Sequence, residues 1–118
     1  MKRTVALAAG LLSGGLTFGI AAAEAPLDGK KLYDANCAKC HGVDGSADTP
    51  AGKAMKAHVL KDPKWVHVEP ATVIHVVREN PKHKAVTEKV TDAELEAITA
   101  HIRELAGGSA SPAPGATK

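Results

Sequence analysis

The clearest hydrophobic periodicity lies near the end of the chain. Apolar residues recur there at steps of three, four and three positions: Leu95, Ile98, Ile102 and Leu105. This spacing places them on one face of an α-helix. The stretch Thr91-Asp92-Ala93-Glu94 has the form of a capping box, and Gly107 follows the last apolar position. We therefore predict a helix between these two signals.

Two further helices are predicted from residues that favour helix starts. Asp28 is a good N-cap for a helix that runs into two cysteines. Pro70 is favoured in a first turn and opens a helix that stops before Pro81. Residues 42–69 are rich in Gly, Pro and Asp, which indicates loops with one short helix around residues 52–58. No segment alternates as a strand does, so we predict an all-α fold.

The two ends of the chain have a different character. Two basic residues precede a run of apolar and small residues, and three alanines then precede Glu24. This pattern predicts a secretory signal peptide over residues 1–23. The alternative is an uncleaved membrane anchor, although the run is richer in Ala and Gly than a spanning helix usually is. Residues 107–118 lack large apolar side chains and predict a disordered Gly/Ser/Pro/Ala tail, which leaves residues 24–106 as one domain.

The charge balance excludes one class of partner. The formal charge of +2 comes from the predicted signal peptide, and the other 95 residues hold 13 basic and 13 acidic side chains. Such a balance provides no basic excess for nucleic-acid binding. Aromatic residues make up only 3% of the chain, so the large rings that usually fill a core are scarce. We expect another bulky group to fill it.

The motif Cys-x-x-Cys-His supplies a candidate for that group. It comprises Cys37, Cys40 and His41. Two thiols at positions i and i+3 lie on one face of a helical turn and can each bond to one vinyl group of a porphyrin. The adjacent imidazole can then bind the iron. We predict one haem c, attached covalently through Cys37 and Cys40, with His41 as an iron ligand.

Three other uses of the cysteines fit less well. A thioredoxin-type redox motif needs a preceding strand, and none is predicted. A zinc site needs a second spaced pair of ligands. A disulfide between Cys37 and Cys40 would close a very small loop and stabilise little.

With these features, residues 27–105 resemble the small class I c-type cytochromes, which are monohaem electron carriers of the periplasm. Gly29, Tyr33 and Cys37 follow at steps of four, as in the first helix of that family. His101 stands where the family's last helix has an aromatic residue, and we expect it to pack against Tyr33. The resemblance implies a cytochrome c-like fold, with three main helices packed around the covalently attached haem.

The resemblance also implies roles for residues outside the motif. Pro50 is expected to offer its carbonyl to the imidazole N–H of His41, which would fix the tautomer of that ligand. Trp65 resembles an indole that lies near a haem propionate, although simple core packing is an equal alternative. Three lysines lie in or near the loop that precedes the last predicted helix: Lys82, Lys84 and Lys89. They are expected to surround the haem edge and steer an acidic partner, or else to form a solvated loop.

The sixth iron ligand departs from the family pattern. Family members usually supply a Met eight residues before the cap of the last helix, and here that position is His83. No Met follows Met55. We therefore predict bis-histidine ligation by His41 and His83, with Met55, another histidine or an open iron as alternatives.

These features predict a periplasmic electron carrier. It is expected to be monomeric, to have no membrane span after signal cleavage, and to pass single electrons between redox proteins without being an enzyme. A second His as axial ligand gives a lower potential than Met does. The alternative function, which requires an open or weakly held sixth position, is a small-gas sensor or a peroxidase-like enzyme.

Overall fold

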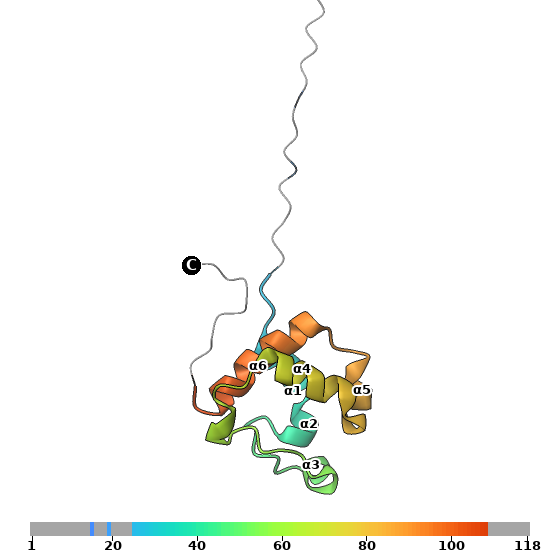
Figure 1. Cartoon of the computed structure of the whole chain (residues 1–118), viewed down its shortest axis with the longest axis vertical. Coiled ribbons are helices and arrows are strands. Elements are labelled where there is room, and N and C mark those ends of the chain that lie inside the picture. Colours follow the sequence, from blue (N-terminus) through green and yellow to red (C-terminus); the bar gives the residue numbers. More distant parts are fainter. Residues whose placement is uncertain (1–14, 16–18, 20–24, 109–118) are drawn as a thin grey trace, which may run out of the picture.

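The computed structural model describes residues 15, 19 and 25–108. Within this part of the chain there are helices and turns but no strands, which confirms the all-α prediction (Figure 1). The elements in chain order are α1 (Gly29–Asn36), α2 (Ala38–His41), α3 (Pro50–Met55), η1 (Pro63–Trp65), α4 (Pro70–Glu79), η2 (Pro81–His83), α5 (Lys84–Thr87) and α6 (Asp92–Leu105). The three predicted main helices are α1, α4 and α6.

The main helices begin where local capping signals predict. The carboxylate of Asp28 accepts a hydrogen bond from the backbone N–H of Lys31 at 3.1 Å and caps α1. At the start of α6, the Thr91 hydroxyl accepts from the Glu94 N–H at 3.2 Å, and the Glu94 carboxylate accepts from the Thr91 N–H at 2.8 Å. Both bonds of the predicted capping box are therefore present.

The short helix expected around residues 52–58 lies slightly earlier in the chain. The Thr49 hydroxyl accepts from the Gly52 N–H at 2.9 Å, so the helix starts at Pro50. Lys56 adopts a left-handed conformation with φ of 54°, and the helix ends at Met55. A single threonine cap and one left-handed residue thus set both ends of α3.

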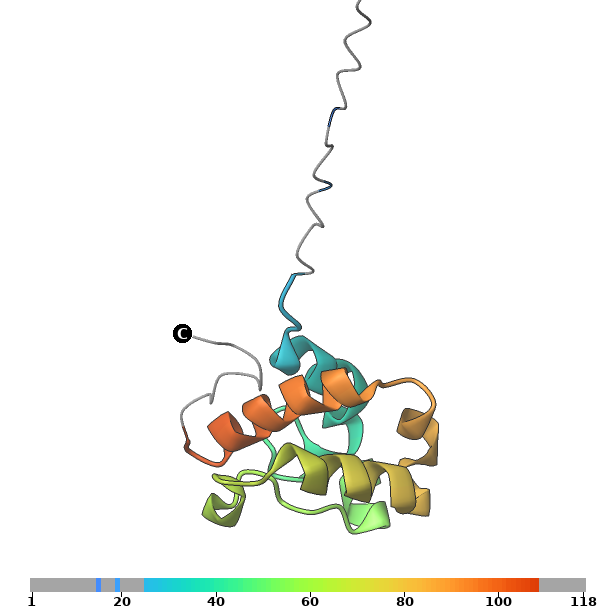
Figure 2. The ribbon, with the colours of Figure 1, turned by 45° about the horizontal axis from the view of Figure 1, so that its top comes forward.

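The core forms where α1 and α4 both pack on α6 (Figure 2). Gly29 makes the close crossing of α1 and α6 possible, because a Cβ atom there would lie 2.0 Å from the carbonyl oxygen of Ala97. Tyr33 is fully buried at this crossing. Its ring meets the ring of His101 edge to face, with 5.1 Å between the ring centres, so the predicted packing of His101 is confirmed.

Both predicted terminal segments lie almost entirely outside the described residues. Of the predicted signal peptide only Gly15 and Gly19 are described, and of the predicted tail only Gly107 and Gly108. None of the helices in the described part is both long enough and apolar enough to cross a membrane.

Candidate functional site

A cavity of about 600 Å³ lies between the Cys-x-x-Cys-His turn, α3, α4 and α6. Its inner wall is apolar and includes Val77, Leu95, Ile98 and Ile102. Cofactor sites typically have volumes of roughly 300–1,000 Å³ and largely apolar linings. The cavity therefore has the size and the surface of a site for a large apolar cofactor.

Cys37 and Cys40 line this cavity and do not form a disulfide. Cys37 ends α1, and α2 begins at the next residue, so the motif occupies one continuous helical turn. Burial raises the pKa of the Cys37 thiol to about 11, which keeps it neutral at physiological pH. Among the described residues, no three His, Cys, Asp or Glu side chains gather as a protein-only metal site.

The turn is held in place by α3, which lies directly against it. The Thr49 hydroxyl donates to the carbonyl of Cys40 at 2.9 Å. A Cβ atom on Gly52 would lie 2.2 Å from that same carbonyl oxygen, so only glycine allows this approach. Neither contact was predicted from the sequence.

The His41 ring has a fixed orientation. Its Nδ1 lies 2.9 Å from the carbonyl oxygen of His58, so Nδ1–H donates to this oxygen and Nε2 keeps its lone pair. Burial lowers the pKa of His41, although the hydrogen bond to the His58 carbonyl opposes this effect. The ring is thus held as a neutral imidazole, which is the form that binds metals.

Pro50 was expected to provide this carbonyl, but the structure shows that His58 provides it. Pro50 is the first residue of α3, and a carbonyl in a first helical turn points along the helix axis. The chain leaves α3 at Lys56 and brings His58 back to the His41 ring. The predicted type of contact is present, but the accepting carbonyl belongs to His58, eight residues after Pro50.

His83 lies across the cavity from His41, with the two rings nearly parallel. Their centres are 6.2 Å apart and their planes differ by 16°. The Nδ1 of His83 lies 3.3 Å from the carbonyl oxygen of Val76, so this ring also has its Nδ1–H directed at the backbone. Two imidazoles bound to opposite sides of one metal ion, at about 2 Å per bond, have ring centres roughly 6.4 Å apart. The distance between the ring centres of His41 and His83 is close to this value.

Met55 and Trp65 also line the cavity. Met55 ends α3, and its side chain is 40% exposed. The indole N–H of Trp65 donates to the carbonyl of Val59 at 2.9 Å, and the ring is half-buried against the core. The position of this indole relative to a haem propionate stays a prediction. The exposed side chains of His67 and His75 do not line the cavity.

The polar rim of the cavity is basic. Its charged lining residues are all lysines, with no Asp or Glu among the described residues that form it: Lys39, Lys56, Lys82 and Lys89. The ammonium of Lys82 donates to the carbonyl of Met55 at 2.8 Å and so connects the two sides of the opening. Lys84, which was expected near the edge, lies outside the lining.

Comparisons with known proteins agree with this site. A family model described as Cytochrome c matches residues 27–106. The chain is 29% identical over 83 residues to the Cbb3-type cytochrome c oxidase subunit CcoP of Azospirillum brasilense, and 30% identical over 84 residues to that of Azospirillum sp. (strain B510). It is 29% identical over 83 residues to the subunit FixP of Sinorhizobium medicae (strain WSM419).

These alignments cover 68% of this chain but only 27–28% of each relative, so the chain spans little more than a quarter of the length of these curated relatives. The family model, in contrast, covers more than half of the chain and includes the spaced pair Cys37 and Cys40. The chain therefore belongs to the cytochrome c family, and the cofactor that it binds covalently is haem c.

Proposed function

We propose that the protein is a periplasmic monohaem c-type cytochrome that carries single electrons between redox proteins, with His41 and His83 as the two iron ligands. The observation that carries this proposal is the pair of imidazole rings, whose centres are 6.2 Å apart across the cavity. The localisation depends on the signal peptide predicted for residues 1–23.

Each residue of the site has a defined task in this proposal. Cys37 and Cys40 form the thioether bonds. The imidazoles of His41 and His83 bind the iron through Nε2, because Nδ1 of each ring faces a backbone carbonyl. When bound, the haem supplies the one-electron couple of its iron.

The hydrogen bonds behind the two ligands influence the potential. A carbonyl that accepts from Nδ1–H makes the imidazole a stronger donor to the metal and holds its ring in place. The carbonyl of Val76 also belongs to the last turn of α4, where the helix dipole is negative. Both effects favour the oxidised iron, so we expect a lower potential than Met ligation would give.

The function as a carrier follows from the number of ligands. Protein ligands on both sides leave no iron position open to a substrate, which favours electron transfer over catalysis. An iron with an open sixth position would instead suit gas sensing or peroxidase-like chemistry. The relatives are subunits of cytochrome oxidases, which is consistent with electron transfer to or from other proteins.

The lysine rim supports an acidic partner. Lys39, Lys56, Lys82 and Lys89 surround the opening, and no carboxylate lies among the lining residues. Such a one-signed rim steers a partner of opposite charge and speeds encounter at low salt. We expect the rate of electron exchange with an acidic redox protein to fall steeply as ionic strength rises.

Ferric absorption and electron paramagnetic resonance spectra of the holoprotein test the ligand assignment. We expect the wild type to be low-spin without the sulfur-to-iron charge-transfer band of Met ligation. His83→Ala should become high-spin or bind added imidazole, and His83→Met should gain the sulfur band. The matched control Met55→Leu should leave the spectrum unchanged.

Two results would contradict the assignment. One is a low-spin spectrum of His83→Ala identical to that of the wild type. The other is a sulfur band in the wild type that Met55→Leu removes. Haem staining of each variant after denaturing electrophoresis shows that attachment through Cys37 and Cys40 has taken place.

A further inference from the structure

The segment that carries His83 has little packing of its own. Its two helical turns, η2 and α5, have three and four residues, and none of these residues is buried. Helices of one turn are not stable by themselves. Within the described part of the chain, the His83 ring makes one hydrogen bond, the 3.3 Å contact to the carbonyl oxygen of Val76. Val86 of α5 packs against the core, and the Lys82 ammonium donates to the Met55 carbonyl at 2.8 Å. A third set of contacts joins the segment to the end of α4.

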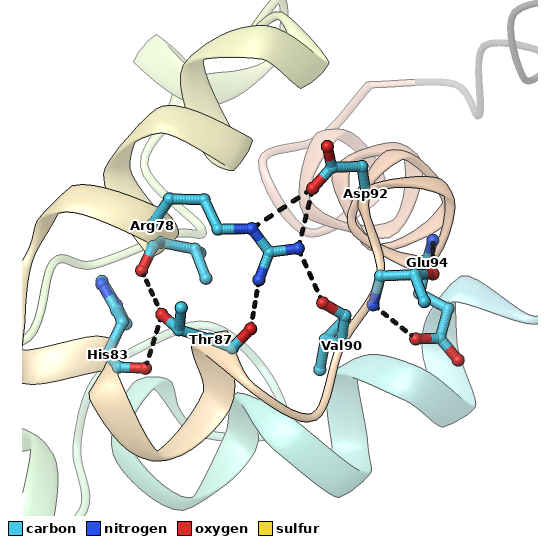
Figure 3. A network of polar contacts seen from close by, with 8 residues as sticks. Arg78, His83, Thr87, Val90, Asp92 and Glu94 are labelled. Atoms are coloured by element: carbon cyan, nitrogen blue, oxygen red, sulfur yellow. Dashed lines mark hydrogen bonds and ion pairs between the residues drawn. The ribbon is translucent and has the colours of Figure 1, made fainter.

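The side chain of Arg78 makes that connection (Figure 3). Arg78 lies in the last turn of α4, and its side chain is only 26% exposed. One Nη2–H donates to the carbonyl of Val90 at 2.7 Å, and Nη1–H donates to the carbonyl of Thr87. Nη2 and Nε also donate to one carboxylate oxygen of Asp92, at 2.7 and 3.2 Å. The planar guanidinium thus holds residues 87–92 at three points.

The side chain of Thr87 connects the same segment to α4 from the other direction. Its hydroxyl lies 2.7 Å from the carbonyl oxygen of Val77 and 3.1 Å from that of His83. Figure 3 shows this hydroxyl between the two oxygens, beside the Arg78 contact to the Thr87 backbone. Arg78 and Thr87 therefore lock the backbone on the C-terminal side of His83 to the end of α4.

We propose that Arg78 is a positioning residue for the sixth iron ligand: its guanidinium clamps residues 87–92 to α4 and so sets how often His83 leaves the iron. This inference rests on the proposed ligation by His83. Hydrogen bonds from a charged donor are stronger than neutral ones, and the fork of a guanidinium fixes geometry that an ammonium does not. Arg78 is not among the residues that line the cavity.

Carbon monoxide binding to the reduced holoprotein measures the release of His83. At high carbon monoxide concentration the observed rate reaches the rate at which His83 leaves the iron. We expect Arg78→Met to raise this limiting rate at least about tenfold, which corresponds to the loss of one hydrogen bond to a charged group. Arg78→Lys should give a limiting rate between those of the wild type and Arg78→Met. Thr87→Val should raise the limiting rate about threefold.

Arg103→Met is the matched control. Arg103 is also poorly exposed, and its Nε–H donates to the carbonyl of Val68 at 2.8 Å at the other end of α6. Its loss removes a similar clamp between a helix and a preceding segment, but far along the chain from His83. The limiting rate of this variant should stay within about twofold of the wild type, whatever it costs in stability.

The outcomes separate this inference from the proposed function. If His83→Ala and the wild type bind carbon monoxide alike, the ligand assignment fails and the inference fails with it. If His83→Ala binds much faster but Arg78→Met stays within twofold of the wild type, only the role of Arg78 is refuted. An equal acceleration in Arg103→Met also refutes it, because the effect would then be general loosening.

A variant with a smaller change covers the case in which Arg78→Met does not fold. Asp92→Asn removes the charge of the partner carboxylate and leaves the two backbone contacts of Arg78 in place. We expect a two- to threefold rise in the limiting rate, as for the loss of a partly exposed ion pair. An unchanged rate in both Asp92→Asn and Thr87→Val overturns the proposal.

Discussion

His101→Phe should make the protein more stable. The imidazole of His101 is 8% exposed, and its Nε2 is buried without a hydrogen-bond partner. A buried polar atom left unpaired costs about 1–3 kcal/mol. Phenylalanine removes that atom and keeps an aromatic ring beside Tyr33, where the present edge-to-face contact has 5.1 Å between ring centres.

The stabilising contact that His101→Phe removes is weak. The Nδ1 of His101 lies 3.3 Å from a carboxylate oxygen of Glu104, whose side chain is 46% exposed. A contact of this length to a half-exposed carboxylate contributes about 0–1 kcal/mol. We therefore expect a net gain of roughly 1 kcal/mol in the free energy of unfolding for His101→Phe.

Guanidinium denaturation of the holoprotein, followed by circular dichroism, measures this change. Glu104→Gln is the control, because it removes the carboxylate and leaves Nε2 of His101 unpaired; its free energy of unfolding should change by less than about 0.5 kcal/mol. A loss of stability in His101→Phe would refute the reasoning. It would mean that the larger ring does not fit between α1 and α6, or that Nε2 is satisfied in solution.

Three further changes test the structure. Gly29→Ala should lower the free energy of unfolding by about 1–3 kcal/mol in denaturant titrations, because the new Cβ would lie 2.0 Å from a backbone oxygen of α6; a neutral result would contradict the close crossing. Tyr33→Phe should cost about 1 kcal/mol, because the hydroxyl donates to the Gly42 carbonyl at 2.7 Å. Burial also raises the pKa of Tyr33 above its ordinary value of 10.0, so wild-type stability should fall as pH rises past that value, and Tyr33→Phe should weaken this fall. The double variant of Cys37→Ala and Cys40→Ala, which cannot attach haem, should lose most of its helical circular dichroism, since the cavity of about 600 Å³ adjoins the core; full helicity would refute that dependence.

Much of the site could be predicted from the sequence, but its supporting contacts could not. The Cys-x-x-Cys-His motif needs only the local geometry of one helical turn, so its residues are recognisable by spacing. The contact of Nδ1 of His41 to a carbonyl was predicted as a type, but His58 provides it rather than Pro50. That choice depends on where the chain turns after α3, and the left-handed Lys56 has no strong sequence signal.

The sequence by itself determined the main helices and their ends, because caps, proline starts and apolar periodicity act over a few neighbouring residues. The resemblance to the class I c-type cytochromes also singled out His83 as the candidate partner of His41, because it stands where that family usually supplies a Met. Only the tertiary structure decided that the two rings lie 6.2 Å apart and that Arg78 holds the returning segment. These contacts join residues many positions apart, and their geometry depends on how α4 and α6 pack, which no local pattern encodes.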